Sequence, residues 1–357
     1  MKIKSWMFQE KGAPMVLAER EQSPGPGEVL VKVVGCGVCH TDLGFVYDGV
    51  PTRHELPLTL GHEISGNVIE AGEGAGDWVG QAVVIPAVIP CGDCAACEDG
   101  QGSICPTQVF PGNDVHGGFA THVIVPAVGL CPVPDLSDSE INPAGMDLAG
   151  LSVIADAVST PYQALLRSDL KPGDLAVFVG AGGVGGFGVQ LAAAMGAHVV
   201  AIDVDSNKLE ALADCGAHLR LSAKDNDFRA LKKGVKDFAK EHGINTWRWR
   251  IFETSGNPIG QATAFGLIGK GSFLGVVGYT PKKLELRLSN LMAFDATARG
   301  NWGCLPEYYP AIIEMVLKGK IKLEPFVERR SLDTINETFE AVHAHQVSRR
   351  VILTPKA

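Results

Sequence analysis

The chain has 357 residues, of which 46% are hydrophobic and 20% are charged, as is typical of a globular protein large enough for two domains. Its net charge of −9 argues against non-specific binding to nucleic acid. No apolar run reaches the length that crosses a membrane, and the N-terminal segment lacks the apolar core of a signal peptide. Nine cysteines without an export signal favour a reducing, cytoplasmic location.

Short apolar runs bounded by glycine and proline predict a β-rich first part of the chain, up to about residue 155. Clear examples are Glu28–Val34 and Gln81–Pro86. This pattern is typical of a small barrel or sandwich that carries loops.

Two loops in this part carry side chains that bind metals. Cys39 and His62 offer a thiolate and an imidazole, which are ligands of open, catalytic zinc sites. A third ligand is needed, and the candidate is Asp156, with Glu63 as a possible fourth that substrate or water displaces. Asp42 is a candidate to accept a hydrogen bond from His62 and fix its tautomer. The alternative is that each residue alone serves packing.

Four cysteines lie close together in the next segment, at the spacing CxxCxxCx7C: Cys91, Cys94, Cys97 and Cys105. Four thiolates at this spacing can form a closed tetrahedral shell around zinc, which braces the fold and has no open position for chemistry. Cytosolic thiols stay reduced, so metal binding is favoured over the alternatives of two disulfides or free thiols.

From about residue 158, strand patterns alternate with helical patterns, which predicts βαβ units and a parallel sheet. A helical stretch ends at Met195, a second covers Lys208–Cys215, and a charged, helical segment over 224–247 is expected to be a solvated face. The expected strands are Leu175–Val179, His198–Ile202, Arg250–Glu253, Ser272–Val277 and, at the end of the chain, Arg350–Thr354.

The first of these strands is followed directly by GxGxxG, the sequence Gly180-Ala-Gly182-Gly-Val184-Gly185. In this motif the first glycine gives the tight turn, the second admits the pyrophosphate and the third lets helix pack on strand. Asp203 ends the next strand, where it would bind both hydroxyls of the adenosine ribose and repel a 2′-phosphate, so NAD is expected rather than NADP. Lys208 either lies beside the ribose or is simply an exposed lysine on the helix. The alternative for the motif is a purely structural turn.

These patterns together resemble the zinc-containing medium-chain alcohol dehydrogenases, over nearly the whole chain. The resemblance rests on GVCHTD (37–42), GHE (61–63), the four-cysteine segment (91–105), GAGGVG (180–185) and Asp203. It implies an α/β fold with a GroES-like β-rich catalytic domain, residues 1–157 and 301–357, and a doubly wound Rossmann domain, residues 158–300. It also implies NAD, one catalytic zinc ion on Cys39 and His62, and one structural zinc ion on the four cysteines.

The family's mechanism gives further residues a role by resemblance. Thr41 would accept the proton of the alcohol, and His40 and Arg350 would meet the pyrophosphate, with ordinary surface charges as the alternative for both. Two positions depart from the family. Asp156 stands where many relatives have a cysteine ligand, and Gly44 replaces the histidine that ends a proton relay, leaving water or His54 to complete it.

The substrate is suggested only by three stretches, residues 2–9, 107–116 and 298–303. They look most like the 6-hydroxycyclohex-1-ene-1-carbonyl-CoA dehydrogenases of anaerobic aromatic degradation, which implies oxidation of an allylic, cyclic alcohol to 6-oxocyclohex-1-ene-1-carbonyl-CoA. The candidate landing sites for CoA are Arg53, Arg248, Arg250, Lys282 and Lys283.

Three other interpretations stay open. They are a generic secondary-alcohol or polyol dehydrogenase, a non-enzymatic protein that binds zinc and nucleotide, and a redox sensor. The family also suggests a homo-oligomer, either a dimer or a tetramer.

Overall fold

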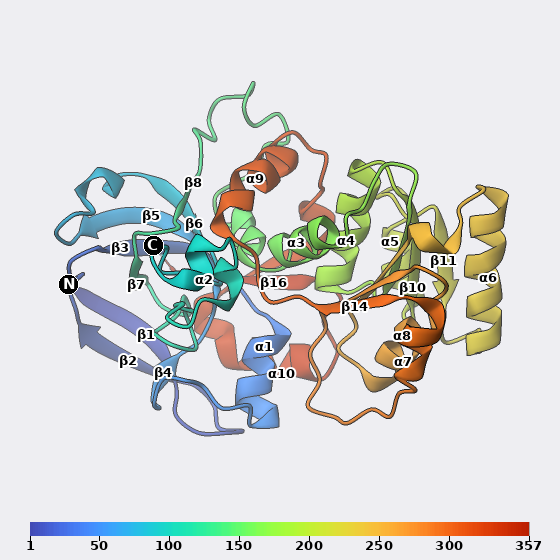
Figure 1. The fold of residues 1–357 in the computed structure, drawn as a ribbon. Helices are drawn as coiled ribbons and strands as arrows, with labels where there is room; N and C mark the ends of the chain where they lie inside the picture. The colour runs from blue at the N-terminus through green and yellow to red at the C-terminus, as the bar shows by residue number, and fades with distance from the viewer. Residues whose placement is uncertain (357) are drawn as a thin grey trace. The chain divides into compact units, whose positions relative to one another are not determined.

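The computed structural model describes residues 1–356 and divides the chain into two compact units. Unit 1 comprises Met1–Ser159, Gly303–Gly319 and the segment from Leu323 onward, and unit 2 comprises Thr160–Trp302 and Lys320–Lys322. Figure 1 colours the two ends of the chain, both within unit 1, blue and red. Within the described residues no helix is both long enough and apolar enough to cross a membrane.

Unit 1 is built on two sheets. A three-stranded sheet has the order β2-β1-β4, and a larger sheet has the order β15-β16-β3-β5-β6-β8, with β7 paired to β3. The strands are β1 (Lys2–Phe8), β2 (Val16–Glu21), β3 (Glu28–Gly37), β4 (Leu58–Thr59), β5 (Glu63–Ala71), β6 (Ala82–Ile85), β7 (His122–Pro126), β8 (Cys131–Pro132), β15 (Val327–Ser331) and β16 (Arg350–Thr354). The C-terminal β16 therefore lies beside β3, which follows from antiparallel pairing at Cys36 and Gly37.

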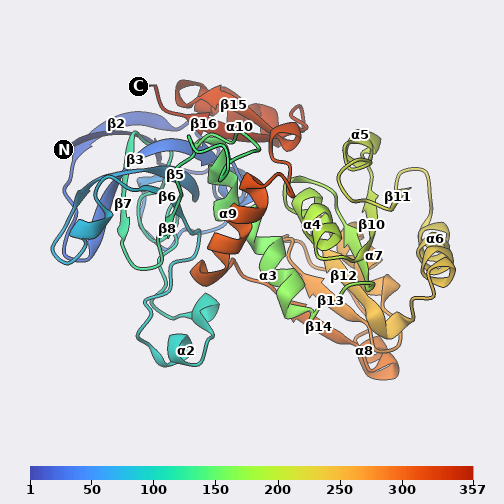
Figure 2. The same ribbon diagram turned by 90° about the horizontal axis from the view of Figure 1, so that it is seen from above.

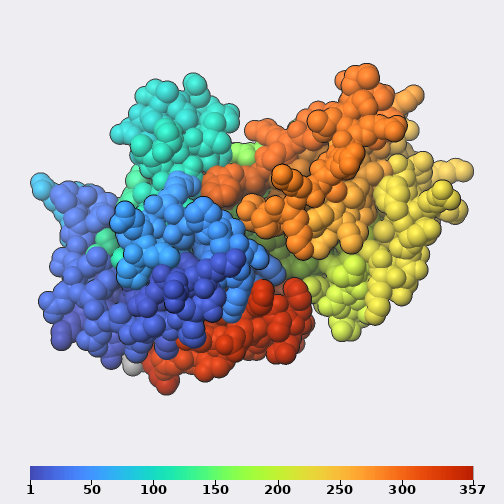
Figure 3. All heavy atoms as spheres, turned by 90° about the horizontal axis from the view of Figure 1, so that it is seen from below, coloured from blue at the N-terminus to red at the C-terminus, as the bar shows by residue number. Residues whose placement is uncertain are grey.

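The core of unit 1 is formed by apolar side chains that alternate along these strands. Val29, Val31 and Val33 of β3 point to one side and pack with Ile64 and Val68 of β5. Short helices connect the strands: α1 (His40–Leu43), α2 (Ala95–Glu98), α9 (Tyr309–Leu317) and α10 (Ile335–His343). Figures 2 and 3 show the segment around α2, in teal, projecting from the rest of unit 1.

Unit 2 contains a six-stranded sheet whose strand order is β11-β10-β9-β12-β13-β14. All five pairings are parallel, so the predicted parallel sheet is confirmed. The strands are β9 (Leu175–Val179), β10 (His198–Asp203), β11 (Leu219–Ser222), β12 (Trp249–Glu253), β13 (Phe273–Val276) and β14 (Thr297–Gly300). The helices are α3 (Ser159–Arg167), α4 (Gly183–Ala194), α5 (Ser206–Ala211), α6 (Phe228–Glu241), α7 (Pro258–Leu267) and α8 (Ser289–Phe294).

Helices cover both faces of this sheet. The odd residues of β9, such as Val177, share a core with α6 and α7. Phe178 points to the opposite face of the sheet, toward Gly188 of α4. A Cβ added at Gly188 would lie 2.3 Å from the ring of Phe178. Helix α5 begins two residues before the predicted start, because Asp205 caps it by accepting a hydrogen bond from the N–H of Asn207.

Candidate functional site

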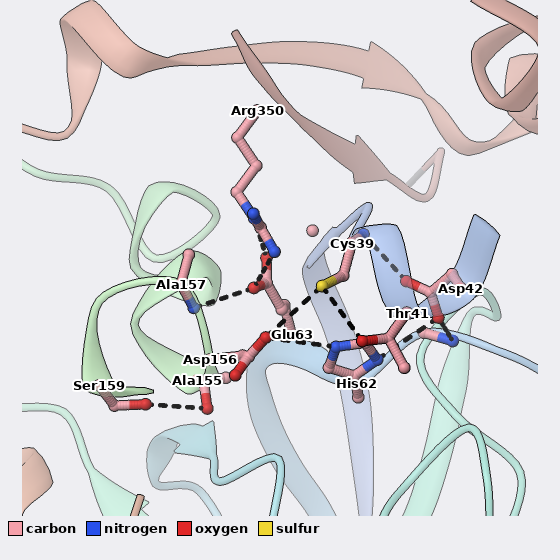
Figure 4. Close-up of polar contacts among 12 residues, drawn as sticks. Cys39, Thr41, Asp42, His62, Glu63, Ala155, Asp156, Ala157, Ser159 and Arg350 are labelled. Atoms are coloured by element: carbon pink, nitrogen blue, oxygen red, sulfur yellow. Dashed lines mark hydrogen bonds and ion pairs between the residues drawn. The ribbon is translucent and has the colours of Figure 1, made fainter. Parts of the chain in front are cut away.

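The side chains of Cys39, His62, Glu63 and Asp156 converge in unit 1, with one potential ligand atom from each lying within 4.8 Å of the others. Figure 4 shows them meeting from separate segments of the chain. Cys39 directly precedes α1, His62 directly precedes β5, Glu63 is its first residue, and Asp156 directly follows the 3-10 turn over 150–155. The structure thus brings together all four residues that the sequence suggested as ligands.

Three of these side chains fit a zinc ion. Sγ of Cys39 lies 3.5 Å from Oδ2 of Asp156, and Nε2 of His62 lies 3.6 Å from the same oxygen. Tetrahedral zinc with ordinary bond lengths separates such ligand atoms by about 3.3 to 3.6 Å. Both ring nitrogens of His62 are buried and have no hydrogen-bond partner within residues 1–356, which a metal on Nε2 would remedy. Three protein ligands leave one position open.

The fourth side chain, Glu63, is held in a different contact. Its carboxylate receives two hydrogen bonds from Arg350, from Nε at 2.6 Å and from Nη2 at 2.5 Å, and a third from the N–H of Ala157 at 3.0 Å. Burial alone would lower the pKa of Arg350, but the carboxylate of Glu63 outweighs burial and raises it. The pair is therefore ionic, and Figure 4 shows Arg350 directed at Glu63.

Asp42 ties the two ligand loops together. Its buried carboxylate accepts hydrogen bonds from the N–H of Cys39 at 2.9 Å and of Gly61 at 3.1 Å. Its Oδ1 also lies 3.4 Å from Nδ1 of His62. Burial would lower the pKa of His62, but the charges of Asp42 and Asp156 raise it well above its usual range. Since zinc binds neutral imidazole, zinc uptake here would release a proton.

The segment that carries Asp156 is anchored by contacts that the sequence did not reveal. The hydroxyl of Tyr309 donates a hydrogen bond to the carbonyl of Ala155 at 2.5 Å, and Ser159 donates to the same carbonyl at 3.2 Å. Tyr309 is fully buried and lies 154 positions further along the chain. No local motif signals such a contact, because it depends on how α9 packs.

The remaining residues of the first loop lie beside this cluster. Oγ1 of Thr41 is 3.7 Å from Sγ of Cys39, and His40 is exposed at the start of α1. The ring of Phe110 packs on His62 with the two centroids 4.9 Å apart. Gly44 continues the helical turn and offers no side chain for proton transfer.

The four cysteines of the projecting segment also fit zinc. Neighbouring Sγ atoms lie 3.5 to 4.0 Å apart. A tetrahedral zinc ion with sulfur at its usual distance requires about 3.8 Å between sulfurs. The tight turn is possible because Gly92 and Gly100 adopt positive φ angles of 86° and 70°. All nine cysteines are free thiols, so the disulfide alternative is not found.

The thiols of this cluster differ in acidity. Burial opposes ionisation of Cys105, but the N–H of Cys91 and the hydroxyl of Thr107 lower its pKa to about 6. Burial, the largest influence on Cys97, raises its pKa to about 12. The N–H of Cys91 and the hydroxyl of Thr107 therefore favour the thiolate form of Cys105, which is the form that binds zinc.

In unit 2 the glycine motif forms the turn between β9 and α4. Gly180 has a φ of 102°, and a Cβ at Gly185 would lie 1.8 Å from the carbonyl oxygen of Gly180, so neither position tolerates a side chain. A Cβ on Gly182 would meet no atom within 4 Å, which leaves room above the turn. An open N-terminus of a twelve-residue helix at this place fits a dinucleotide pyrophosphate.

Asp203 stands at the carboxyl end of β10, next to this turn. One carboxylate oxygen accepts a hydrogen bond from the N–H of Ala181 at 2.6 Å and the other from the N–H of Asp205 at 2.9 Å. Val184 is half-buried in the first turn of α4, and Lys208 is half-buried on α5. His40 and Arg350, the other expected cofactor contacts, belong to unit 1, so their role stays a prediction.

Comparison with known families matches both units. Residues 25–135 match the model of the alcohol dehydrogenase GroES-like domain, and residues 183–318 match that of the zinc-binding dehydrogenases. An alcohol dehydrogenase of Geobacillus stearothermophilus is 32% identical over 98% of this chain and 99% of its own length.

Two further proteins are similar along nearly their whole lengths. The L-threonine 3-dehydrogenase of Pyrococcus furiosus is 29% identical over 96% of each chain. The solved structure of the alcohol dehydrogenase from Aeropyrum pernix superposes with a TM-score of 0.85, at 28% identity, over 99% of this chain and 100% of that one.

Proposed function

Because the chain belongs to the zinc-dependent medium-chain alcohol dehydrogenase family, an oxidoreductase family that acts on CH–OH groups with zinc and NAD, we propose that it oxidises a secondary alcohol to a ketone. The observation that carries the proposal is the set of Cys39, His62 and Asp156 at zinc-ligand spacing with a fourth position open. In this proposal unit 1 is the catalytic domain, and unit 2 binds NAD.

Each residue of the site has a part in the proposed reaction. Cys39, His62 and Asp156 would hold zinc, which when bound supplies a Lewis acid that lowers the pKa of an alcohol. NAD supplies the acceptor for the hydride. The hydroxyl of Thr41, which lies 3.7 Å from Sγ of Cys39, would accept the proton of the alcohol. Asp42 keeps His62 in position through its contacts with both ligand loops.

The substrate class that is best supported is a small secondary alcohol or polyol. The relatives include alcohol dehydrogenases and L-threonine 3-dehydrogenases. The second name points to oxidation of a hydroxyl group on a secondary carbon. The aspartate ligand adds a carboxylate where many relatives have a thiolate, so the bound metal would be more electrophilic.

A second, narrower candidate is 6-hydroxycyclohex-1-ene-1-carbonyl-CoA, which is favoured by the resemblance of residues 2–9, 107–116 and 298–303. Its CoA part would need cationic contacts. Three of the five basic residues suggested for that contact already have acidic partners: Arg53 pairs with Asp114, and Arg248 and Arg250 pair with Asp174. This leaves Lys282 and Lys283, both exposed, as the cations to examine.

The test is the rate of NADH formation with 2-butanol, cyclohexanol, L-threonine and the cyclic hydroxyacyl-CoA at equal concentrations. Turnover of the simple alcohols supports the broader proposal, and turnover of the thioester alone selects the narrower one. The Thr41→Val variant, which preserves shape but removes the hydroxyl, should retain zinc and lose activity. No turnover of any of these compounds by protein that contains both zinc ions would contradict the proposal.

We also propose that the protein forms homo-oligomers through the outer edge of the parallel sheet. Strand β14 ends the sheet, and all four of its residues are exposed. Leu288 and Met292 of the neighbouring segment are 68% and 77% exposed. An unpaired edge beside exposed apolar side chains favours pairing with a second copy. Light scattering on Met292→Glu should show smaller particles than wild type, and a monomeric wild type would refute the proposal.

A further inference from the structure

A buried carboxylate lies where the strand order of the parallel sheet changes direction. Glu253, which is 1% exposed, is the last residue of β12 and pairs in register with Val179, the last residue of β9. Strand β9 pairs with β10, which follows it in the chain, on one side, and with the later strand β12 on the other. In open α/β sheets, ligands bind beyond the carboxyl ends of the strands at such a point.

The two oxygens of this carboxylate have unequal surroundings. Oε1 accepts three hydrogen bonds, from the N–H of Ser255 at 2.8 Å, from the hydroxyl of Ser255 at 2.6 Å and from the N–H of Gly256 at 3.1 Å. Oε2 is shielded from water and accepts no hydrogen bond within residues 1–356. Burial raises the pKa of Glu253, and the hydrogen bonds to Oε1 oppose that rise. A buried acceptor without a partner costs free energy, so this position suits a role beyond stability.

The loop that follows, residues 254–257, packs against the glycine turn. The hydroxyl of Thr254 donates a hydrogen bond to the carbonyl of Gly180 at 2.7 Å. A Cβ on Gly180 would lie 2.5 Å from the backbone nitrogen of Ser255, and one on Gly185 would lie 2.6 Å from Oγ1 of Thr254. The loop therefore forms one wall of the turn between β9 and α4.

The carboxylate of Glu253 begins a chain of hydrogen bonds that shapes this loop. Oγ of Ser255, which donates to Glu253, accepts the N–H of Asn257 at 3.2 Å. Oδ1 of Asn257 in turn caps α7 by accepting the N–H of Ile259 at 2.9 Å. Between them, Gly256 has a φ of 60°, which favours glycine. The backbone of the loop is thus fixed from Glu253 to the start of α7.

We propose that Glu253 is a positioning residue for NAD: it fixes the loop over residues 254–257, which holds the glycine turn in the shape that receives the pyrophosphate. This inference rests on the proposed function, in which unit 2 binds NAD. A turn that is fixed before the cofactor arrives binds it more tightly, because less conformational freedom is lost on binding. Without the carboxylate, the N–H groups of Ser255 and Gly256 lose their acceptor, and the loop can relax away from Gly180.

The test is a fluorescence titration of the zinc-loaded full chain with NADH, which measures binding without turnover. Glu253→Met removes the acceptor and should raise the Kd for NADH by about tenfold. Glu253→Gln keeps an oxygen that can accept the same three hydrogen bonds, and it should restore most of the affinity. In turnover with an alcohol, Glu253→Met should raise the KM for NAD by a larger factor than it lowers kcat.

Asp174→Asn is the matched control. Asp174 is also a buried carboxylate of unit 2, 2% exposed, but it directly precedes β9 and so lies at the opposite edge of the same sheet. Its replacement weakens the ion pair with Arg248, so it should lower the thermal midpoint and leave the Kd for NADH unchanged. Thr254→Val keeps the shape of the side chain but removes its hydrogen bond to Gly180, and it should also weaken NADH binding.

Wild-type affinity for NADH in Glu253→Met, or in Thr254→Val if the first variant does not fold, would overturn this proposal and leave the proposed function intact. An equal loss of affinity in Asp174→Asn would also overturn it, because the effect would then follow from general stability. A wild type that binds NADH but oxidises no alcohol would contradict the proposed function, while the ranking of the variants would still support the role of Glu253.

Discussion

Replacing Arg350 by Met removes the only side-chain hydrogen-bond donor that residues 1–356 give to the buried carboxylate of Glu63. The side chain of Glu63 is 0% exposed and that of Arg350 is 5% exposed, and two hydrogen bonds join them. Only the N–H of Ala157 would remain as a partner. Loss of one partner from such a pair costs about 3 to 5 kcal/mol of unfolding free energy, because an uncompensated charge stays buried.

The loss should depend on pH in a defined direction. Burial already raises the pKa of Glu63 in the folded protein, and Arg350 opposes that rise. Without Arg350 the pKa of Glu63 rises further, so the folded state of the variant binds more protons. The variant is therefore less destabilised at pH 5 than at pH 8. Urea unfolding at both pH values, followed by tryptophan fluorescence and circular dichroism, measures this difference.

Two further variants serve as controls for this prediction. Arg329→Met breaks ion pairs with Asp147 and Glu324 that are largely exposed, and it should cost about 1 kcal/mol or less. Adding Glu63→Gln to Arg350→Met removes the stranded charge and should restore part of the stability. If Arg350→Met lowers the urea midpoint no more than Arg329→Met does, the argument for a buried ion pair is refuted.

Four other predictions follow from the two metal clusters, the dinucleotide turn and the half-buried His116. Asp156→Asn should lose one of two zinc ions by atomic emission and most of its activity, and retention of both would contradict its role as a ligand. Cys97→Ser should lose the other zinc ion and lower the thermal midpoint. Asp203→Ala should reduce the preference for NAD over NADP by about tenfold or more in kcat/KM, and an unchanged ratio would exclude the ribose contact. The lowered pKa of His116 means that the folded state resists protonation, so wild type should lose about 1 to 2 kcal/mol, after allowance for solvent screening, as pH falls from 6.5 toward 4 in phosphate-free buffer. His116→Asn, which keeps an acceptor for Thr59, should lack this part of the loss.

The sequence predicted the fold class well because its signals are local. GxGxxG after an apolar strand specifies a turn in which neighbouring residues contact each other, and the alternation of strands and helices specifies a parallel sheet. The four-cysteine segment is equally local, since all its thiols lie within fifteen positions. The family comparison agrees with the predicted α/β fold, the zinc and the NAD.

The partners of the site residues were not predictable in the same way. Arg350 was expected to meet a pyrophosphate, and the structure pairs it with Glu63, 287 positions earlier. Glu63 was suggested as a displaceable ligand, and this stays a prediction: its carboxylate is engaged by Arg350 and Ala157, while one of its oxygens lies within 4.8 Å of the other candidate ligand atoms. Tyr309, which holds the carbonyl of Ala155, was not singled out at all.

The sequence by itself thus determined which chemistry the chain carries: thiolates, imidazoles and carboxylates that bind zinc, and a glycine turn that receives a dinucleotide. Only the tertiary structure decided how those groups are neutralised and held. Glu63 and Arg350 meet because β16 lies beside β3, which pairs with β5. Within residues 1–356, Arg20 has no ion-pair partner, because its strand turns its side chain away from the face that carries Glu19 and Glu21. Charge compensation depends on which strands become neighbours, and strand neighbours far apart in the chain leave no local pattern in the sequence.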